Sequence, residues 1–240
     1  MTKTALFIPC YNEEKRLDIP AFERFIEAEL NSIDFFFVND GSIDNTSKLL
    51  QQKLLNYENV SLIENVRNIG KGPALRNAIL NSDLEDYEYF GFIDADSDIP
   101  LNQIRFLRNE IEAGDYLIAI SKRDLLKNLK KLSVRNFGSV FIVKIANKLI
   151  KLQPGLSDTQ CGCKLFKREI YRLCFKDPFI SKWLFDIEIF LRLRSGIPYL
   201  RNRIVEVPVL GYSKSNFSNF KFSQNLRILK QLYFIYKTYK

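Results

Sequence analysis

Short apolar runs alternate with longer stretches of helical periodicity through the first half of the chain. Five runs rich in β-branched or aromatic residues, each followed by a polar turn, predict strands at 4–9, 34–39, 60–64, 89–94 and 116–120. Helical patterns fall between them, at about 14–30, 44–56, 71–82 and 101–113. This alternation predicts an α/β fold with a mostly parallel central sheet and helices on both faces.

Polar, charged or glycine-bearing residues follow every predicted strand. The stretches are PCYNEE, NDGSIDNT, NVRNIGKG, DADSD and SKRD. Any one of them could be a solvated loop. Ligands of open α/β sheets bind outside the carboxyl ends of the strands, so five such stretches on one sheet edge favour a binding site there.

The stretch DADSD places Asp94, Asp96 and Asp98 at every second position after an apolar strand. Crowding three carboxylates raises the free energy unless a positive charge lies among them. Oxygen ligands suit Mg²⁺ or Mn²⁺, and these ions commonly also bind substrate phosphates. We therefore expect a metal site and a substrate that carries a diphosphate.

Two common nucleotide-binding motifs are absent. The stretch NIGKGP around Lys71 lacks the first glycine of a Walker A loop and the Ser or Thr after its lysine, and no GxGxxG follows the first strand. P-loop NTPase, kinase-like and dinucleotide-binding functions are therefore disfavoured, although Lys71 still supplies a cation.

Composition narrows the chemistry further. The net charge of +8 indicates an anionic partner, and the absence of histidine excludes Ser-His-Asp and Cys-His catalysis. The four cysteines lack CxxC spacing, which favours reduced thiols in a cytosolic compartment over a zinc site. No segment reaches the ~20 uninterrupted apolar residues of a membrane span.

Two segments are strongly basic. Residues 122–151 carry nine Lys or Arg and predict one or two amphipathic helices, either core helices with a cationic outer face or interfacial helices on anionic lipid. The tail 213–240 has six basic residues and no acid, interleaved with aromatics. That composition can bind single-stranded nucleic acid, but helical spacing of Ile228, Leu229, Leu232 and Ile235 favours docking on protein or a bilayer.

Several motifs together resemble a known family. The stretches FIPCYNEE, FVNDGSIDNT, NIGKGPALRNAI and FIDADSD, in this order, resemble the nucleotide-sugar half of family 2 glycosyltransferases of the GT-A fold. The later stretches DTQCGCKLFKREIYRLCF and KWLFDIEIFLRLR resemble the polyprenyl-phosphate sugar transferases, such as the dolichyl-phosphate β-glucosyltransferases. The resemblance runs from about residue 4 to 214 and implies a GT-A catalytic domain at 1–212 and a C-terminal tail at 213–240.

The resemblance implies a donor site. The base and ribose would be framed by Pro9, Tyr11, Glu13, Asn39 and Asp40. Asn39 stands where many members have Asp, which keeps a carbonyl acceptor for a uracil N–H, so UDP is expected and GDP is the alternative. The ribose, diphosphate and metal would be held by Asp94, Ala95, Asp96 and Asp98, with Lys71 nearby and with Ser213 and Lys214 in a loop that closes over the diphosphate.

The resemblance also implies an acceptor site. Arg123 and Arg135 would hold an acceptor phosphate, which is largely a dianion at neutral pH and needs little help from a base. A sugar hydroxyl would instead need a carboxylate base, for which Asp186 and Asp158 are the candidates. Both also have a structural alternative, since Asp158 could cap a turn and Asp186 could begin a helix.

These observations lead to one hypothesis and two alternatives. We expect an inverting transferase that moves a hexose, glucose, from a UDP-sugar to a polyprenyl phosphate on the cytoplasmic side of an anionic membrane, with no nucleic-acid partner. The first alternative is a family 2 enzyme that glycosylates a hydroxyl of a surface polysaccharide or glycolipid. The second is a non-catalytic basic module that binds membrane or nucleic acid.

Overall fold

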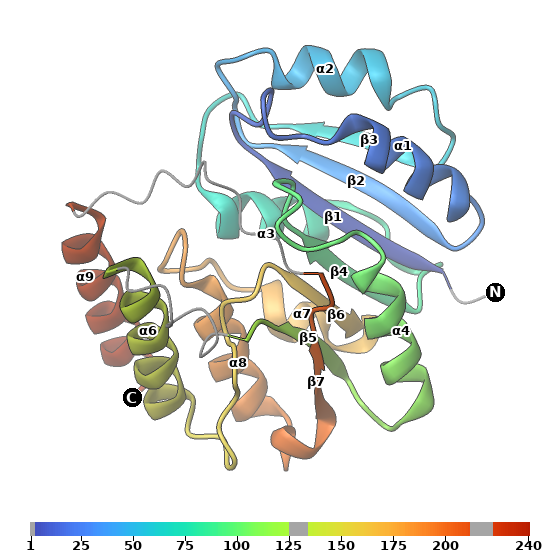
Figure 1. Cartoon of the computed structure of the whole chain (residues 1–240). Helices are drawn as coiled ribbons and strands as arrows, with labels where there is room; N and C mark the ends of the chain where they lie inside the picture. Colours follow the sequence, from blue (N-terminus) through green and yellow to red (C-terminus); the bar gives the residue numbers. More distant parts are fainter. Residues whose placement is uncertain (1–2, 125–133, 212–222) are drawn as a thin grey trace.

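A seven-stranded sheet organises the part of the chain that the computed structural model describes, residues 3–124, 134–211 and 223–240 (Figure 1). Its order is β3-β2-β1-β4-β6-β5-β7. The strands are β1 (Thr4–Cys10), β2 (Ile33–Asn39), β3 (Val60–Glu64), β4 (Tyr89–Ile93), β5 (Ile118–Lys122), β6 (Cys163–Lys167) and β7 (Ile204–Pro208). Only β6 among them runs antiparallel to its neighbours, so the predicted mostly parallel sheet is confirmed.

Helices cover both faces of this sheet. One face carries α1 (Ile19–Ala28), α2 (Thr46–Lys53) and α4 (Gln103–Ala113). The other carries α3 (Lys71–Asn81), α7 (Tyr171–Phe175) and α8 (Phe185–Gly196). Successive residues of β1 serve the two cores in turn, because strand side chains alternate between faces: Leu6 and Ile8 pack on the first, Ala5 and Phe7 on the second. Short 3₁₀ turns at Arg168–Ile170 and Leu200–Arg203 join the later elements.

The helix α1 shows how local sequence sets an element boundary. The carboxylate of Asp18 accepts a hydrogen bond from the Ala21 backbone N–H at 3.1 Å, and a proline stands in the first turn. Both features favour a helix start, because the first backbone N–H groups have no partner within the helix. The helix therefore begins later than the 14–30 pattern predicts.

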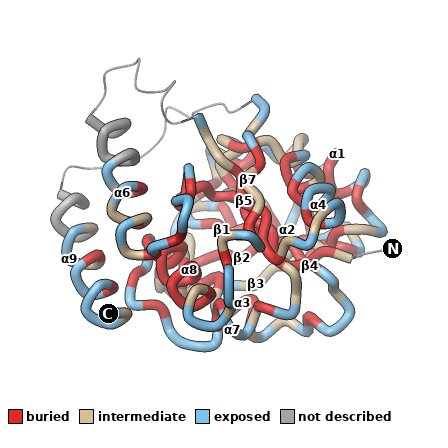
Figure 2. The backbone as a smooth tube through the Cα atoms, turned by 90° about the horizontal axis from the view of Figure 1, so that it is seen from below, coloured by how far each residue is buried: buried red, intermediate tan, exposed pale blue. Residues whose placement is uncertain are grey.

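The helices α6 (Val134–Ile150) and α9 (Ser223–Thr238) lie side by side at one end of the molecule (Figures 1 and 2). Their inner residues Ala146, Ile150, Leu232 and Ile235 are buried in the core that includes α8. Their outward residues include Phe141, Leu229, Tyr233, Phe234 and Tyr236, all exposed. Each helix thus buries one side and exposes the other where its side chains are described, whereas 125–133 and 212–222 lie outside the described residues, and the prediction for the two whole basic segments stays a prediction.

No helix within the described ranges is long and apolar enough to cross a membrane. The four cysteines, Cys10, Cys161, Cys163 and Cys174, are unpaired and buried, in agreement with the prediction of free thiols. Burial raises the pKa of the Cys161 thiol to about 12 and raises the pKa of the other three as well. All four are therefore held in the protonated form.

Candidate active site

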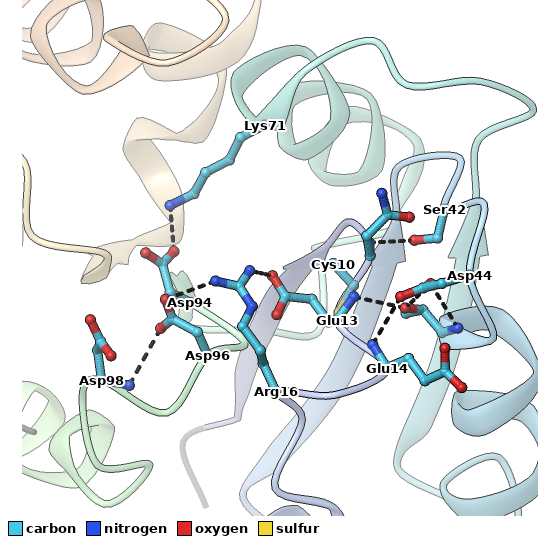
Figure 3. Close-up of polar contacts among 12 residues, drawn as sticks. Cys10, Glu13, Glu14, Arg16, Ser42, Asp44, Lys71, Asp94, Asp96 and Asp98 are labelled. Atoms are coloured by element: carbon cyan, nitrogen blue, oxygen red, sulfur yellow. Dashed lines mark hydrogen bonds and ion pairs between the residues drawn. The ribbon is translucent and has the colours of Figure 1, made fainter. Parts of the chain in front are cut away.

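The carboxyl ends of β1, β2 and β4 and the start of α3 meet at one edge of the sheet (Figure 3). These three strands are adjacent and parallel, so the residues that follow them lie together. The sequence-predicted residues gathered here are Pro9, Tyr11, Glu13, Asn39, Asp40, Lys71, Asp94, Ala95, Asp96 and Asp98. Tyr11 is exposed, at 41%, whereas Ala95 is buried.

Asp40 shapes the loop that precedes α3. Its Oδ1 accepts hydrogen bonds from the Asn65 side chain and the Ile69 backbone N–H, both at 2.9 Å. Its Oδ2 accepts the Gly70 backbone N–H at 2.8 Å. Both carboxylate oxygens therefore hold the stretch 65–70 against the end of β2, and the predicted contact of Asp40 with a nucleoside stays a prediction.

Asn39 is likewise engaged within the protein. Its Oδ1 accepts the Ser42 hydroxyl at 2.6 Å and the Ser42 backbone N–H at 3.2 Å, and its amide nitrogen donates to Glu64 at 3.0 Å. At 3% exposure its carbonyl is close to saturated, since an amide oxygen has two lone pairs. A uracil contact there would require Ser42 to give way.

Lys71 is the first residue of α3 and forms an ion pair with Asp94 at the end of β4. Its ammonium lies over the rings of Phe92 and Phe185, at 5.8 and 5.9 Å from their centroids. Burial lowers the pKa of Lys71, but the carboxylates of Asp94 and Asp186 together raise it above its ordinary value. Lys71 is therefore a fixed, partly buried cation at the centre of the site.

A second cation, Arg16, lies on the other side of the carboxylates. Its guanidinium pairs with Glu13, and its Nη1 lies 3.9 Å from the Asp96 carboxylate (Figure 3). Burial raises the pKa of Glu13 from 4.5 to about 7, although Arg16 opposes the shift. Arg16 was not singled out from the sequence, because a lone arginine three residues after a glutamate has no distinctive pattern.

The carboxylates of the DADSD stretch meet one requirement of a divalent cation site but not another. Burial and the negative charges of Asp94 and Asp98 raise the pKa of Asp96, which is the crowding that a cation would relieve. In the described part of the chain, however, no three His, Cys, Asp or Glu side chains converge on one point that could hold a metal ion. Asp94 and Asp96 thus have the oxygen chemistry of Mg²⁺ or Mn²⁺ ligands, and their metal role is a proposal.

Two residues predicted in different roles form a close ion pair. Arg123 follows β5, and its Nε and Nη2 donate to the two carboxylate oxygens of Asp158 at 2.7 and 3.1 Å. The Asp158 side chain is completely buried and also accepts the Gln160 backbone N–H at 3.1 Å. Asp158 is thus engaged with Arg123, whereas the side chains of Arg135, Ser213 and Lys214 lie outside the described residues.

The other candidate base, Asp186, lies in the first turn of α8 and is paired with a buried lysine. The ammonium of Lys164 donates to Asp186 Oδ1 and to the Cys161 carbonyl, each at 2.6 Å. Burial raises the pKa of Asp186 even though Lys164 and Lys71 lower it. Lys164 belongs to the quoted stretch DTQCGCKLFKREIYRLCF but was given no role there, because a lysine in a short strand is normally solvated.

The segment 158–162 connects the two halves of the site. The Gly162 carbonyl accepts the Asp94 backbone N–H at 2.9 Å, and a Cβ atom at Gly162 would lie 2.0 Å from Asp94 Oδ2. At its other end the segment holds Asp158 against Arg123. A cation at the end of β5 and the carboxylates at the end of β4 are therefore held by one stretch of chain.

Comparison with known proteins identifies the family of the chain. A family profile described as glycosyl transferase family 2 matches residues 5–175. The chain belongs to glycosyl transferase family 2. Similar family members include a dolichyl-phosphate beta-glucosyltransferase of Trichomonas vaginalis, 30% identical over 223 residues, and one of Dictyostelium discoideum, 29% identical over 219 residues. The matches cover 85% and 81% of this chain but 64% and 63% of those proteins.

Solved structures of low sequence identity to this chain share its fold. Glucosyl-3-phosphoglycerate synthase from Mycobacterium tuberculosis, in complex with Mn²⁺, UDP-glucose and phosphoglyceric acid, aligns with a TM-score of 0.70 over 99% of this chain and 79% of that one. The identity is 17%, so this likeness shows the fold alone. The predicted GT-A fold is thereby confirmed.

Proposed function

We propose that this protein transfers a hexose, glucose, from a UDP-sugar to a polyprenyl phosphate with inversion at the anomeric carbon. The observation that carries the proposal is the segment 158–162, which joins Arg123 to Asp94. A guanidinium suits a phosphate acceptor, and the neighbouring carboxylates suit a metal-bound diphosphate donor. The dolichyl-phosphate beta-glucosyltransferases similar to this chain support the same acceptor and sugar.

On the donor side, Lys71 would place its positive charge near the departing nucleoside diphosphate. Its position is held by Asp94 and by two aromatic rings, so little reorganisation is needed when charge develops. A divalent ion held by Asp94 and Asp96 would add Lewis-acid stabilisation of the same leaving group. A UDP-sugar donor is supported by the UDP-glucose complex of the structural relative, and a GDP-sugar is the alternative.

On the acceptor side, Arg123 would orient the phosphate for attack. A phosphate oxygen forms the new bond to the anomeric carbon while the bond to the nucleoside diphosphate breaks, and the electron pair leaves with the diphosphate. The acceptor phosphate, with a second pKa of about 6, is mostly a dianion at neutral pH and brings its own nucleophilic oxygen. No general base is required for this step.

A hydroxyl acceptor, as in a growing polysaccharide, fits the site less well. It would need a general base, and both carboxylate candidates are already engaged, Asp158 with Arg123 and Asp186 with Lys164.

We also propose that the outward faces of α6 and α9 contact an anionic membrane surface. Exposed Lys144, Lys148, Lys230 and Lys237 accompany the aromatic residues there.

The deciding experiment follows label from radiolabelled UDP-glucose, with Mg²⁺ or Mn²⁺, into either a short-chain polyprenyl phosphate or a water-soluble glycan. We expect label in the lipid phase, and loss of that label with Arg123→Ala but not with Lys15→Ala, which removes an exposed charge near the site. Label in the glycan alone would contradict the polyprenyl-phosphate acceptor and indicate a function in polysaccharide synthesis. Label from GDP-glucose in place of UDP-glucose would correct the donor.

A further inference from the structure

The segment Ile180–Leu184, immediately before α8, touches both the C-terminal helix α9 and the donor site. We infer that Gln231 and Tyr239 are positioning residues, which act through this segment to hold Lys71 in the donor site. The inference rests on the proposed function only where it concerns the donor. The positioning itself is supported by contacts that the segment makes with α9 on one side and with the start of α3 on the other.

On the α9 side, the hydroxyl of Ser181 donates to the Gln231 side-chain oxygen. The same hydroxyl oxygen accepts the backbone N–H groups of Leu184 at 2.7 Å and Trp183 at 3.2 Å. Ser181 is completely buried, so these bonds are protected from competition with water. Gln231 therefore fixes the orientation of the hydroxyl that starts α8.

A second set of contacts joins the C-terminal end of the chain to the same segment. Glu188 of α8 accepts the backbone N–H groups of Ile180 and Ser181, at 3.0 and 2.8 Å. The Tyr239 hydroxyl donates to Glu188 at 3.2 Å and accepts from Arg192 Nε at 2.9 Å. Glu188 is fully buried, so the loss of one partner would leave a buried charge short of a hydrogen bond.

On the donor side, the segment fixes the first turn of α3. The Lys182 carbonyl accepts the Gly72 backbone N–H at 3.0 Å, one of the N–H groups that has no partner within the helix. The aliphatic stem of Lys182 packs on Gly70, where an added Cβ would lie 2.7 Å from Lys182 Cβ. Lys71 lies between these two glycines, so a shift of the segment moves the residue that pairs with Asp94.

The chain carries its own reporter for this inference. Trp183 is the sole tryptophan and lies within the segment, with 63% of its side chain exposed. Its fluorescence can therefore follow UDP binding at the donor site. The amide of Gly72 supplies a second signal that needs no ligand, because its exchange with solvent requires the bond to Lys182 to open.

The test compares Gln231→Leu and Gln231→Glu, each made in the 240-residue chain, with the wild type and with Thr238→Val on the exposed side of the same helix. Glu keeps an acceptor for the Ser181 hydroxyl, whereas Leu removes it. We expect the Leu variant to exchange the Gly72 amide roughly tenfold faster and to bind UDP about tenfold more weakly, the equivalent of one hydrogen bond. The Leu6 amide in β1, measured alongside by NMR, reports how far the same lost bond lowers global stability.

Recovery of both signals by Gln231→Glu would assign them to the acceptor of the Ser181 hydroxyl. The inference is overturned if Gly72 exchange and UDP affinity are the same in Gln231→Leu as in the wild type. It is overturned equally if UDP affinity stays at the wild-type value while the Gly72 and Leu6 amides accelerate by the same factor, because a loss of global stability alone would do that. If Gly72 responds as expected but the wild type binds no UDP, the positioning inference holds and the proposed donor is wrong.

Discussion

Lys164 and Asp186 form a buried ion pair, with Nζ at 2.6 Å from Oδ1 and the lysine side chain completely shielded from solvent. Removing either partner leaves an uncompensated charge in the core. We expect Lys164→Met or Asp186→Leu alone to lower the free energy of unfolding by about 3–5 kcal/mol. The double variant should lose clearly less than the sum of the two, as measured by urea unfolding. Additive losses would show that the pair is not coupled.

The Arg123–Asp158 pair predicts an effect on acceptor binding. In Asp158→Asn the Arg123 guanidinium loses its bidentate carboxylate partner. Hydrogen bonds to a charged group contribute about 1.5–3 kcal/mol, and this is the stabilisation of Arg123 that the variant reduces. We expect the KM for polyprenyl phosphate to rise roughly tenfold or more by the same principle, while the affinity for UDP is unchanged. A lower kcat with an unchanged acceptor KM would instead indicate that Asp158 acts directly in the reaction.

Gly162 is predicted to tolerate no side chain. Alanine there would bring a Cβ to 2.0 Å from Asp94 Oδ2 and so displace the carboxylate from Lys71. We expect Gly162→Ala to lose about 100-fold or more of its transferase activity, the scale reached by small displacements at catalytic centres. Gly155→Ala is the control, because its Cβ would meet only the side-chain amide of Asn147 at 3.0 Å. Similar activity in both variants would contradict the prediction.

Glu13 predicts a pH dependence of stability. Burial raises its pKa from 4.5 to about 7, so between these values the folded chain binds more protons at this site than the unfolded chain. Its contribution to stability is therefore greatest below about pH 4.5 and falls as the pH rises to about 7, by up to about 3 kcal/mol. In Glu13→Gln this fall should disappear from urea unfolding curves recorded across that range. An unchanged slope would assign the dependence to other groups.

The outward face of α9 predicts membrane binding. We expect the double variant Tyr233→Ala and Phe234→Ala to co-sediment with anionic vesicles at least roughly tenfold more weakly, because two inserted aromatic rings are lost. Tyr199→Ala, which removes a still more exposed aromatic elsewhere, is the control. Added salt should weaken the wild-type interaction, since lysines contribute to it. Equal binding by all three proteins would rule out this face.

The apolar runs were sufficient to predict β1 to β5, because each is a mainly apolar strand followed by polar residues, even though the edge strand β3 is only partly buried. The strands β6 and β7 were not predicted, because their own sequences lack a clear strand pattern. In CKLFK the buried Lys164 interrupts the apolar pattern, and IVEVP is short and ends in a proline. Both strands are defined by their neighbours in the sheet rather than by their own residues.

The rule that ligands bind at the carboxyl ends of strands was sufficient to bring the predicted donor residues to one sheet edge, but it could not place 158–162 there. This segment reaches the same edge because β6 runs antiparallel, so the residues that precede it lie where β4 and β5 end. Contacts such as Asp40 with Gly70 or Arg123 with Asp158 were also beyond prediction, because they join residues far apart in sequence. Residue types could be inferred from the motifs, but their partners depend on the fold.

The burial of all four cysteines has a practical consequence for spectroscopy. A thiol that is shielded and protonated reacts slowly with maleimides and methanethiosulfonates, because the thiolate is the nucleophile. A single cysteine introduced at an exposed position of α9 would therefore be labelled selectively without first replacing the native ones. A nitroxide placed there would measure how deeply this helix enters a bilayer in the otherwise unaltered chain.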